Sequence, residues 1–182
     1  MKLKQLVLTG LFAAFTAVCA IITIPLPVTL VPINLALLAV FLTGALLPKG
    51  AALGAQAVYL LLGLVGVPVF AGFAAGPGIL MGPTGGYLIA YPVMAFLIAL
   101  VKEKSKGRFC CIFTIAAMVA ALIICYLLGT SWYAVVTGRT FAESLTLAVL
   151  PFILPDTVKL AVAYLASVAL EKPLARITAV KA

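Results

Sequence analysis

The residues of this chain best suited to chemistry are Asp156 and Lys159, which lie three positions apart in an apolar stretch near the C-terminus. At this spacing both side chains occupy one face of a helix. Ionisable groups inside an apolar helix are costly and usually face a cavity or a partner. We therefore interpret the pair as a binding site, in which Lys159 attracts a carboxylate and Asp156 accepts hydrogen bonds from N–H donors. The alternative is a mutual salt bridge that fixes helix packing.

The residue before this pair indicates where its helix begins. Pro155 suits the first turn of a helix, where its missing N–H costs nothing. Asp156 then lies in the same turn, at the positive end of the helix dipole. A ligand with an acid at one end and amide-like N–H groups at the other would match the two side chains.

The composition places this helix in a membrane. Of the 182 residues, 66% are hydrophobic and 9% are charged, whereas soluble domains carry roughly 25% charged residues. We predict an all-α integral membrane protein, with a single transmembrane domain over residues 1–182 that crosses the cell membrane several times. Because a bilayer core needs about 20 apolar residues per helix, the apolar runs predict six spans: 6–24, 33–47, 51–65, 87–101, 109–128 and 152–170.

The basic residues predict the orientation of these spans. Lys and Arg are retained on the cytoplasmic side of a membrane. With the N- and C-termini placed in the cytoplasm, Arg139 is the only basic residue in the outer connections and Lys159 is the only one within a span. The net charge of +8 is therefore explained by basic residues in the predicted cytoplasmic segments. It does not indicate nucleic-acid binding, which would gather basic residues on one folded face.

The three connections predicted on the outer side are long and apolar. They cover residues 25–32, 66–86 and 129–151 and are rich in Pro, Gly and aromatic residues. Irregular apolar backbone is expected to fold down over the bundle, where its polar groups can be paired internally. We expect these loops to close a ligand pocket that opens outward. The glycine-rich second connection is either a packed re-entrant segment or a pocket wall, with Phe70, Phe73 and Tyr87 as flat apolar contacts.

The chain lacks the groups that most enzymes use. It has no His, its four Cys form no Cys-x-x-Cys pair, and the glycine-rich stretch 82–86 has no Lys for phosphate binding. We expect no enzyme activity, no cofactor and no metal site. The main alternative to a binding subunit is a stand-alone or proton-coupled small-molecule transporter with Asp156 as its proton site.

Small residues recur along the first span. Ala13-x-x-x-Ala17 and Gly10-x-x-x-Ala14 are pairs that let another helix approach closely. That helix belongs either to this chain or to a partner subunit.

Three motifs, taken in order, resemble the BioY family of biotin-capturing S components of energy-coupling-factor (ECF) transporters. They are Pro68-Val-Phe-Ala-Gly72, then Gly82-Pro-Thr-Gly-Gly-Tyr-Leu88, and then Pro151-Phe152 followed by Asp156-x-x-Lys159. The resemblance implies the six-helix S-component fold, with biotin as the transported ligand. It also implies a transmembrane coupling subunit and two ATPase subunits as partners.

The resemblance also implies a set of functional residues. Ala13 and Ala17 match the first-helix motif that docks on the coupling subunit. Two features depart from the family pattern: Asn34-Leu35-Ala36 stands where members often carry Thr-x-Gln, and Pro155 stands where Gly is frequent. The expected contacts with biotin are Asp156, Lys159, Tyr87, Phe70, Phe73, Gly72, Thr84 and Asn34.

Overall fold

Helices account for most of the chain. The computed structural model describes residues 3–25, 27, 29–105 and 110–179. The helices are α1 (Leu3–Ile21), α2 (Ala36–Leu46), α3 (Lys49–Leu64), α4 (Pro77–Met81), α5 (Gly85–Lys104), α6 (Cys110–Thr137), α7 (Phe141–Ala148) and α8 (Ile153–Ala179). Two 3₁₀ turns, η1 (Ala71–Phe73) and η2 (Leu150–Phe152), and two short strands, β1 (Thr23–Ile24) and β2 (Ile33–Asn34), complete the described elements.

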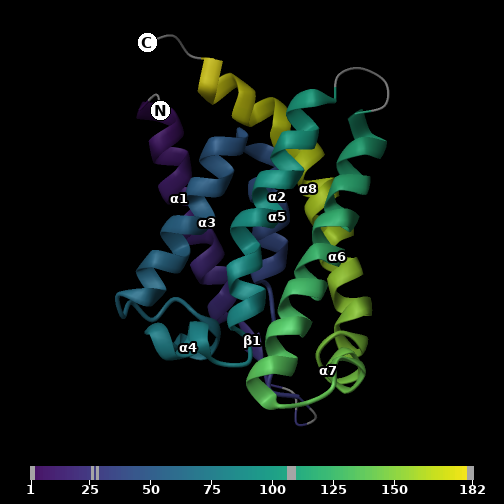
Figure 1. Cartoon of the computed structure of the whole chain (residues 1–182). Coiled ribbons are helices and arrows are strands. Elements are labelled where there is room, and N and C mark those ends of the chain that lie inside the picture. Colours follow the sequence, from purple (N-terminus) through teal and green to yellow (C-terminus); the bar gives the residue numbers. More distant parts are fainter. Residues whose placement is uncertain (1–2, 26, 28, 106–109, 180–182) are drawn as a thin grey trace.

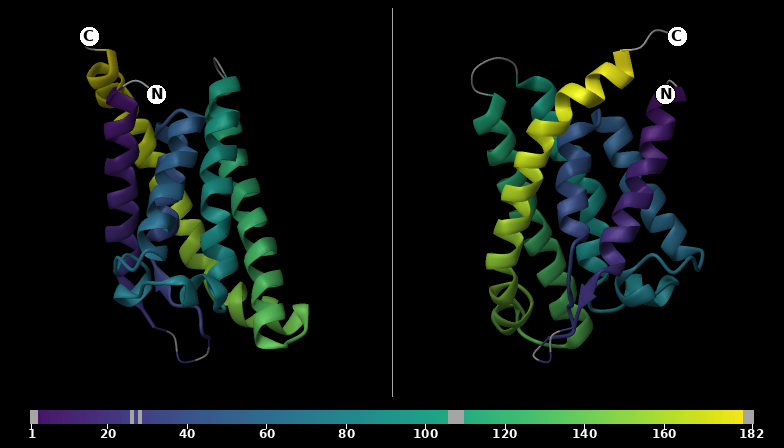
Figure 2. Two further views of the ribbon diagram at one scale, coloured as in Figure 1. Left: turned by 60° about the vertical axis from the view of Figure 1, so that its left-hand side comes forward. Right: turned by 180° about the vertical axis from the view of Figure 1, so that it is seen from behind.

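Four segments are long and apolar enough to cross a bilayer, namely α1, α5, α6 and the stretch that contains α7 and α8. The helices α2 and α3 are apolar but shorter, so the count of six spans stays a prediction. The start of α1 and the end of α8 lie at one end of the bundle, and α4, α7 and the strands lie at the other (Figure 1). Figure 2 shows the same division from two further sides. The first and last described helices therefore end on one side of the bundle, and the placement of the N- and C-termini in the cytoplasm stays a prediction.

The inner and outer faces of the helices differ in side-chain size more than in polarity. Residues such as Leu11 and Val158 are exposed on the outside of the bundle, whereas Ala13, Ala52 and Ala55 are buried inside it. Lipid tails are as apolar as a protein core, so helix association in a membrane depends on close packing, which small residues permit. This explains why the inner faces are not marked by a hydrophobic stripe.

The third outer connection was predicted wrongly. Residues 129–137 continue α6, and residues 141–148 form α7, so Trp132 and Tyr133 lie in a helix. The stretch 129–137 contains no Pro, and the first residue that breaks the helix is Gly138, whose φ is 67°. Thr140 and Glu143 then form a capping box that starts α7.

The other two outer connections also contain regular structure. The strands pair antiparallel, with Thr23 opposite Asn34 and Ile24 opposite Ile33. The Gly72 N–H donates to the Thr23 hydroxyl at 3.3 Å, which ties the second connection to this ribbon. Phe70 is buried, and its ring lies against Gly63, where a Cβ would overlap it. The two loops therefore cover the end of the bundle as one layer.

Two consecutive residues at the end of α5 hold the opposite end of the bundle together. Lys102 Nζ donates to the carbonyl of Ala45 at 2.7 Å and forms an ion pair with Glu171 at 3.2 Å. The Glu103 carboxylate accepts the backbone N–H of Lys49 at 2.9 Å. Lys102 thus pairs a free carbonyl in the last turn of α2, and Glu103 pairs a free N–H in the first turn of α3. Each carries the charge that the dipole of that helix end favours. Four further basic residues of the predicted cytoplasmic side, Lys2, Lys106, Arg108 and Lys181, lie outside the described residues.

A polar cluster joins the first three helices. Gln56 is fully buried, and its Nε2 donates to the hydroxyls of Thr16 and Thr43 at 3.1 and 3.0 Å. Those hydroxyls donate to backbone carbonyls of their own helices. The Oε1 atom of Gln56 has no hydrogen-bond partner in the described part of the chain.

We predict that Gln56→Leu changes the free energy of unfolding by less than about 1 kcal/mol. The substitution loses two hydrogen bonds but also removes a buried acceptor without a partner, and these contributions are of similar size. Gln56→Ala should cost about 2 kcal/mol more, because it leaves a cavity. Melting temperatures of the purified variants in detergent would check both values. A Gln56→Leu protein as unstable as Gln56→Ala would contradict the prediction.

Candidate functional site

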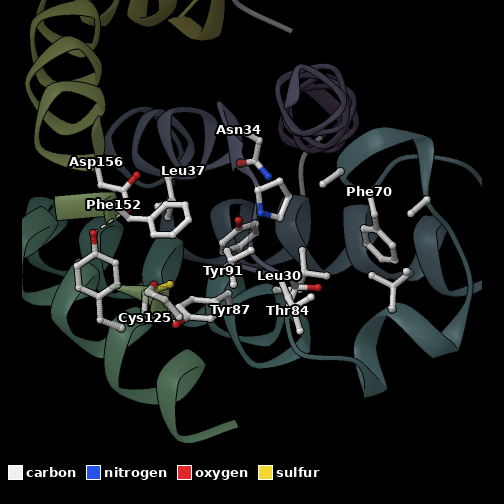
Figure 3. Close-up of a pocket in the computed structure, with 18 of the residues that line it drawn as sticks. Leu30, Asn34, Leu37, Phe70, Thr84, Tyr87, Tyr91, Cys125, Phe152 and Asp156 are labelled. Atoms are coloured by element: carbon white, nitrogen blue, oxygen red, sulfur yellow. Dashed lines mark hydrogen bonds between the residues drawn. The ribbon is translucent and has the colours of Figure 1, made fainter. Parts of the chain in front are cut away.

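A cavity of about 260 Å³ lies under the loop layer, between the helices. Figure 3 shows Asp156 and Phe152 at one end, Phe70 at the other, and Asn34 and Tyr91 between them. Most of its lining is apolar or aromatic, and among the residues that the structure describes Asp156 and Lys159 are the only charged ones in that lining. A largely apolar cavity with a few polar groups at one place is typical of small-molecule sites.

The charged pair lies where α8 begins. Asp156 and Lys159 are 2% and 7% exposed, and Lys159 Nζ donates to Asp156 Oδ1 at 2.7 Å. The other carboxylate oxygen, Oδ2, accepts a hydrogen bond from the hydroxyl of Tyr126 on α6 at 2.8 Å. Asp156 also lies in the first turn of α8, as predicted from Pro155. Buried charges of this kind are tolerated only when they are paired and hydrogen-bonded.

Six of the eight predicted ligand contacts line this cavity: Asn34, Phe70, Thr84, Tyr87, Asp156 and Lys159. Asn34 is the last residue of β2, and its side-chain oxygen accepts the N–H of Ala36 at 3.0 Å, which anchors the start of α2. Tyr87 presents its ring to the cavity. Its hydroxyl lies 3.2 Å from the Thr130 hydroxyl and donates to the carbonyl of Ala148 at 3.3 Å.

Gly72 and Phe73 are not brought into the cavity lining. Both have positive φ, of 66° and 62°, so the backbone turns at this point in the left-handed region. The turn directs Phe73 outward, and 66% of its surface is exposed. In this structure Phe73 therefore points away from the cavity, and Gly72 lies in the loop outside the cavity lining.

Comparisons with known proteins identify the family. Residues 1–176 match the model described as the BioY family. This chain belongs to the BioY family. It is 37% identical over 163 residues to a probable biotin transporter BioY of Pyrococcus horikoshii, covering 90% of this chain and 93% of that one. It is 38% identical over 173 residues to the biotin transporter BioY of Thermotoga maritima, covering 93% and 97%.

A solved structure shares the fold of this BioY chain. The crystal structure of an S-component for biotin from an ECF-type ABC transporter superposes with a TM-score of 0.85 at 26% sequence identity. The match covers 94% of this chain and 92% of the other. Together with the apolar helices, these relatives establish a multi-pass membrane protein with the S-component fold.

The small-residue stripe of α1 is divided between two faces. Ala13 and Ala17 are 1% and 8% exposed inside the chain itself, on a helix that packs mainly against α3 and α2. Gly10 and Ala14 are exposed, and nothing lies within 4 Å of a Cβ placed on Gly10. In this structure Ala13 and Ala17 therefore pack within the chain, and Gly10 and Ala14 are the exposed members of the stripe.

Several tyrosines of the site in this BioY chain were not predicted from the sequence. Tyr59, Tyr91 and Tyr126 all line the cavity. The ring centroid of Tyr59 lies 5.6 Å from that of Phe70 and 6.5 Å from that of Tyr91. One signal was available: each of these tyrosines places a polar atom in the half of its helix nearest the predicted outer side.

Proposed function

We propose that this protein is the biotin-binding subunit of an ECF transporter and captures biotin from the outer side of the membrane. The observation that carries the proposal is the buried Asp156–Lys159 pair at one end of an aromatic and apolar cavity. Biotin offers matching chemistry, since it has a ureido group with two N–H donors and one acceptor, an apolar bicyclic ring and a carboxylate.

The charges favour one orientation of biotin. A ligand carboxylate at Lys159 would also lie close to Asp156, because the two side chains are 2.7 Å apart. Like charges in a cavity of low dielectric repel strongly. The ureido group avoids this repulsion, because its oxygen can accept from Lys159 while one N–H donates to Asp156. We therefore place the ureido ring at the pair and the carboxylate chain toward Asn34 and Thr84.

The expected partners are a transmembrane coupling subunit and two ATPase subunits, which supply the energy for uptake. The fold shared with an S-component of an ECF-type ABC transporter supports this proposal. The exposed small residues of α1, Gly10 and Ala14, offer a face on which a partner helix can pack closely.

Two measurements test this function. The purified protein should bind biotin, and biotin methyl ester should bind within about tenfold of biotin if the carboxylate lies away from Lys159, since tenfold corresponds to 1.4 kcal/mol. Cells that express the protein should take up biotin faster with the coupling and ATPase subunits than without them. Uptake at the same rate with and without those subunits, and stopped by a proton ionophore, would instead support a proton-coupled transporter.

A further inference from the structure

Tyr126 forms a hydrogen bond with Asp156 of the binding pair, and this bond has no role in the proposed function. Its hydroxyl donates to Asp156 Oδ2 at 2.8 Å, while Lys159 occupies Oδ1 at 2.7 Å. The ring of Tyr126 also lines the cavity. Both neighbours of the carboxylate are therefore hydrogen-bond donors, which suits an ionised acceptor.

The contact joins two helices that pack mainly against other neighbours. In the described residues α6 lies chiefly against α5, and α8 lies chiefly against α2 (Figure 1). Asp156 is in the first turn of α8, so its side chain is held from its own helix by Lys159, three residues later, and from the neighbouring α6 by Tyr126. A carboxylate held from two directions keeps one orientation.

We propose that Tyr126 is a positioning residue for ligand recognition, an inference that rests on the proposed function. Its hydroxyl fixes the plane of the Asp156 carboxylate, so that Oδ1 stays directed at Lys159 and at the ligand. Without this bond, Asp156 can rotate, and a ligand has to restrict that rotation when it binds. Restricting free groups on binding lowers affinity. Tyr126 thus favours ligands that bring an N–H donor to a fixed oxygen.

A double-mutant cycle between Tyr126 and Asp156 tests the proposal. Tyr126→Phe keeps the ring and removes the hydroxyl, and it should weaken biotin binding roughly tenfold, because hydrogen bonds to charged groups are the stronger kind. In an Asp156→Asn background the same substitution should cost less than about twofold, since coupled residues give effects that are not additive. The matched control is Tyr133→Phe, a buried tyrosine on the same helix that does not line the cavity.

The wild-type protein, the two single mutants and the double mutant are also compared without ligand. Their melting temperatures can be measured even where biotin binding is weak, and the losses from Tyr126→Phe and Asp156→Asn should add to more than the loss in the double mutant. Equal costs of Tyr126→Phe in both backgrounds, or a Tyr133→Phe protein that binds as poorly as Tyr126→Phe, would overturn the proposal. If the wild-type protein binds no biotin, the proposed function fails, and the melting temperatures alone decide whether Tyr126 and Asp156 are coupled.

Discussion

Exchanging the two charges of the pair, Asp156→Lys with Lys159→Asp, should abolish biotin binding while the protein still folds. The exchange retains two opposite charges on the same face of α8, three residues apart. It moves the donor and the acceptor to each other's places, so the ureido group meets the wrong partner at both points. We expect the affinity for biotin to fall by at least about 100-fold, which corresponds to two lost charge-assisted hydrogen bonds of about 1.5 kcal/mol each.

This exchange separates a ligand site from a structural salt bridge. Removing one partner, as in Lys159→Ala, leaves a buried charge and costs about 3–5 kcal/mol of stability, so lost binding could reflect unfolding. The exchanged pair avoids that cost. It loses about 0.3–1 kcal/mol from a cation near the helix N-terminus and about 1.5 kcal/mol from the hydrogen bond that Tyr126 donates to Asp156. Val158→Ala is the control, because Val158 lies between the two and 55% of its surface is exposed. If the exchanged protein bound biotin with wild-type affinity in an equilibrium binding measurement, the pair would be a structural salt bridge and not a ligand site.

The membrane character and the charged pair could be predicted from sequence because each depends on residue type alone. Few charges and long apolar runs exclude a water-facing surface. The cost of burying Asp156 and Lys159 requires that they meet each other or a ligand, whatever the detailed fold. Pro155 also predicted the first turn of α8 correctly, since a proline restricts its own backbone locally.

The details that could not be predicted depend on contacts between distant segments. The absence of Pro in residues 129–137 permits a helix but does not require one, and the packing of Gly129 and Trp132 against α5 favours the extension of α6. Phe73 looked like a wall residue because it is aromatic and close to Phe70, but a left-handed turn sends the two rings in different directions. Tyr126 was not predicted because a tyrosine in a span is ordinary until its partner on another helix, Asp156, is known.

The glycines of the α5–α6 contact also depend on contacts between distant segments, and replacing them should have the second large effect. Gly129 receives the ring of Tyr87, and Gly86 receives Trp132, so each helix offers a glycine to an aromatic side chain of the other. A Cβ at either position would overlap those atoms. Trp132 also donates from Nε1 to the carbonyl of Gly82 at 2.9 Å, so it cannot move aside freely. The close approach of α5 and α6 therefore requires both glycines.

We expect Gly129→Ala and Gly86→Ala each to destabilise the protein by about 1–3 kcal/mol, the usual cost of overpacking a filled interior. In a protein of this size the melting temperature should fall by about 2–4 °C for each kcal/mol. Gly129→Ala should also weaken biotin binding, because it displaces Tyr87, whose ring lines the cavity and whose hydroxyl bonds α6 and the end of α7. Gly50→Ala is the control, since nothing lies within 4 Å of its Cβ position on α3. If the Gly129→Ala and Gly50→Ala proteins had the same melting temperature, the Tyr87 ring would have room to move. The contact between Gly129 and Tyr87 would then not be tight enough to fix this wall of the site.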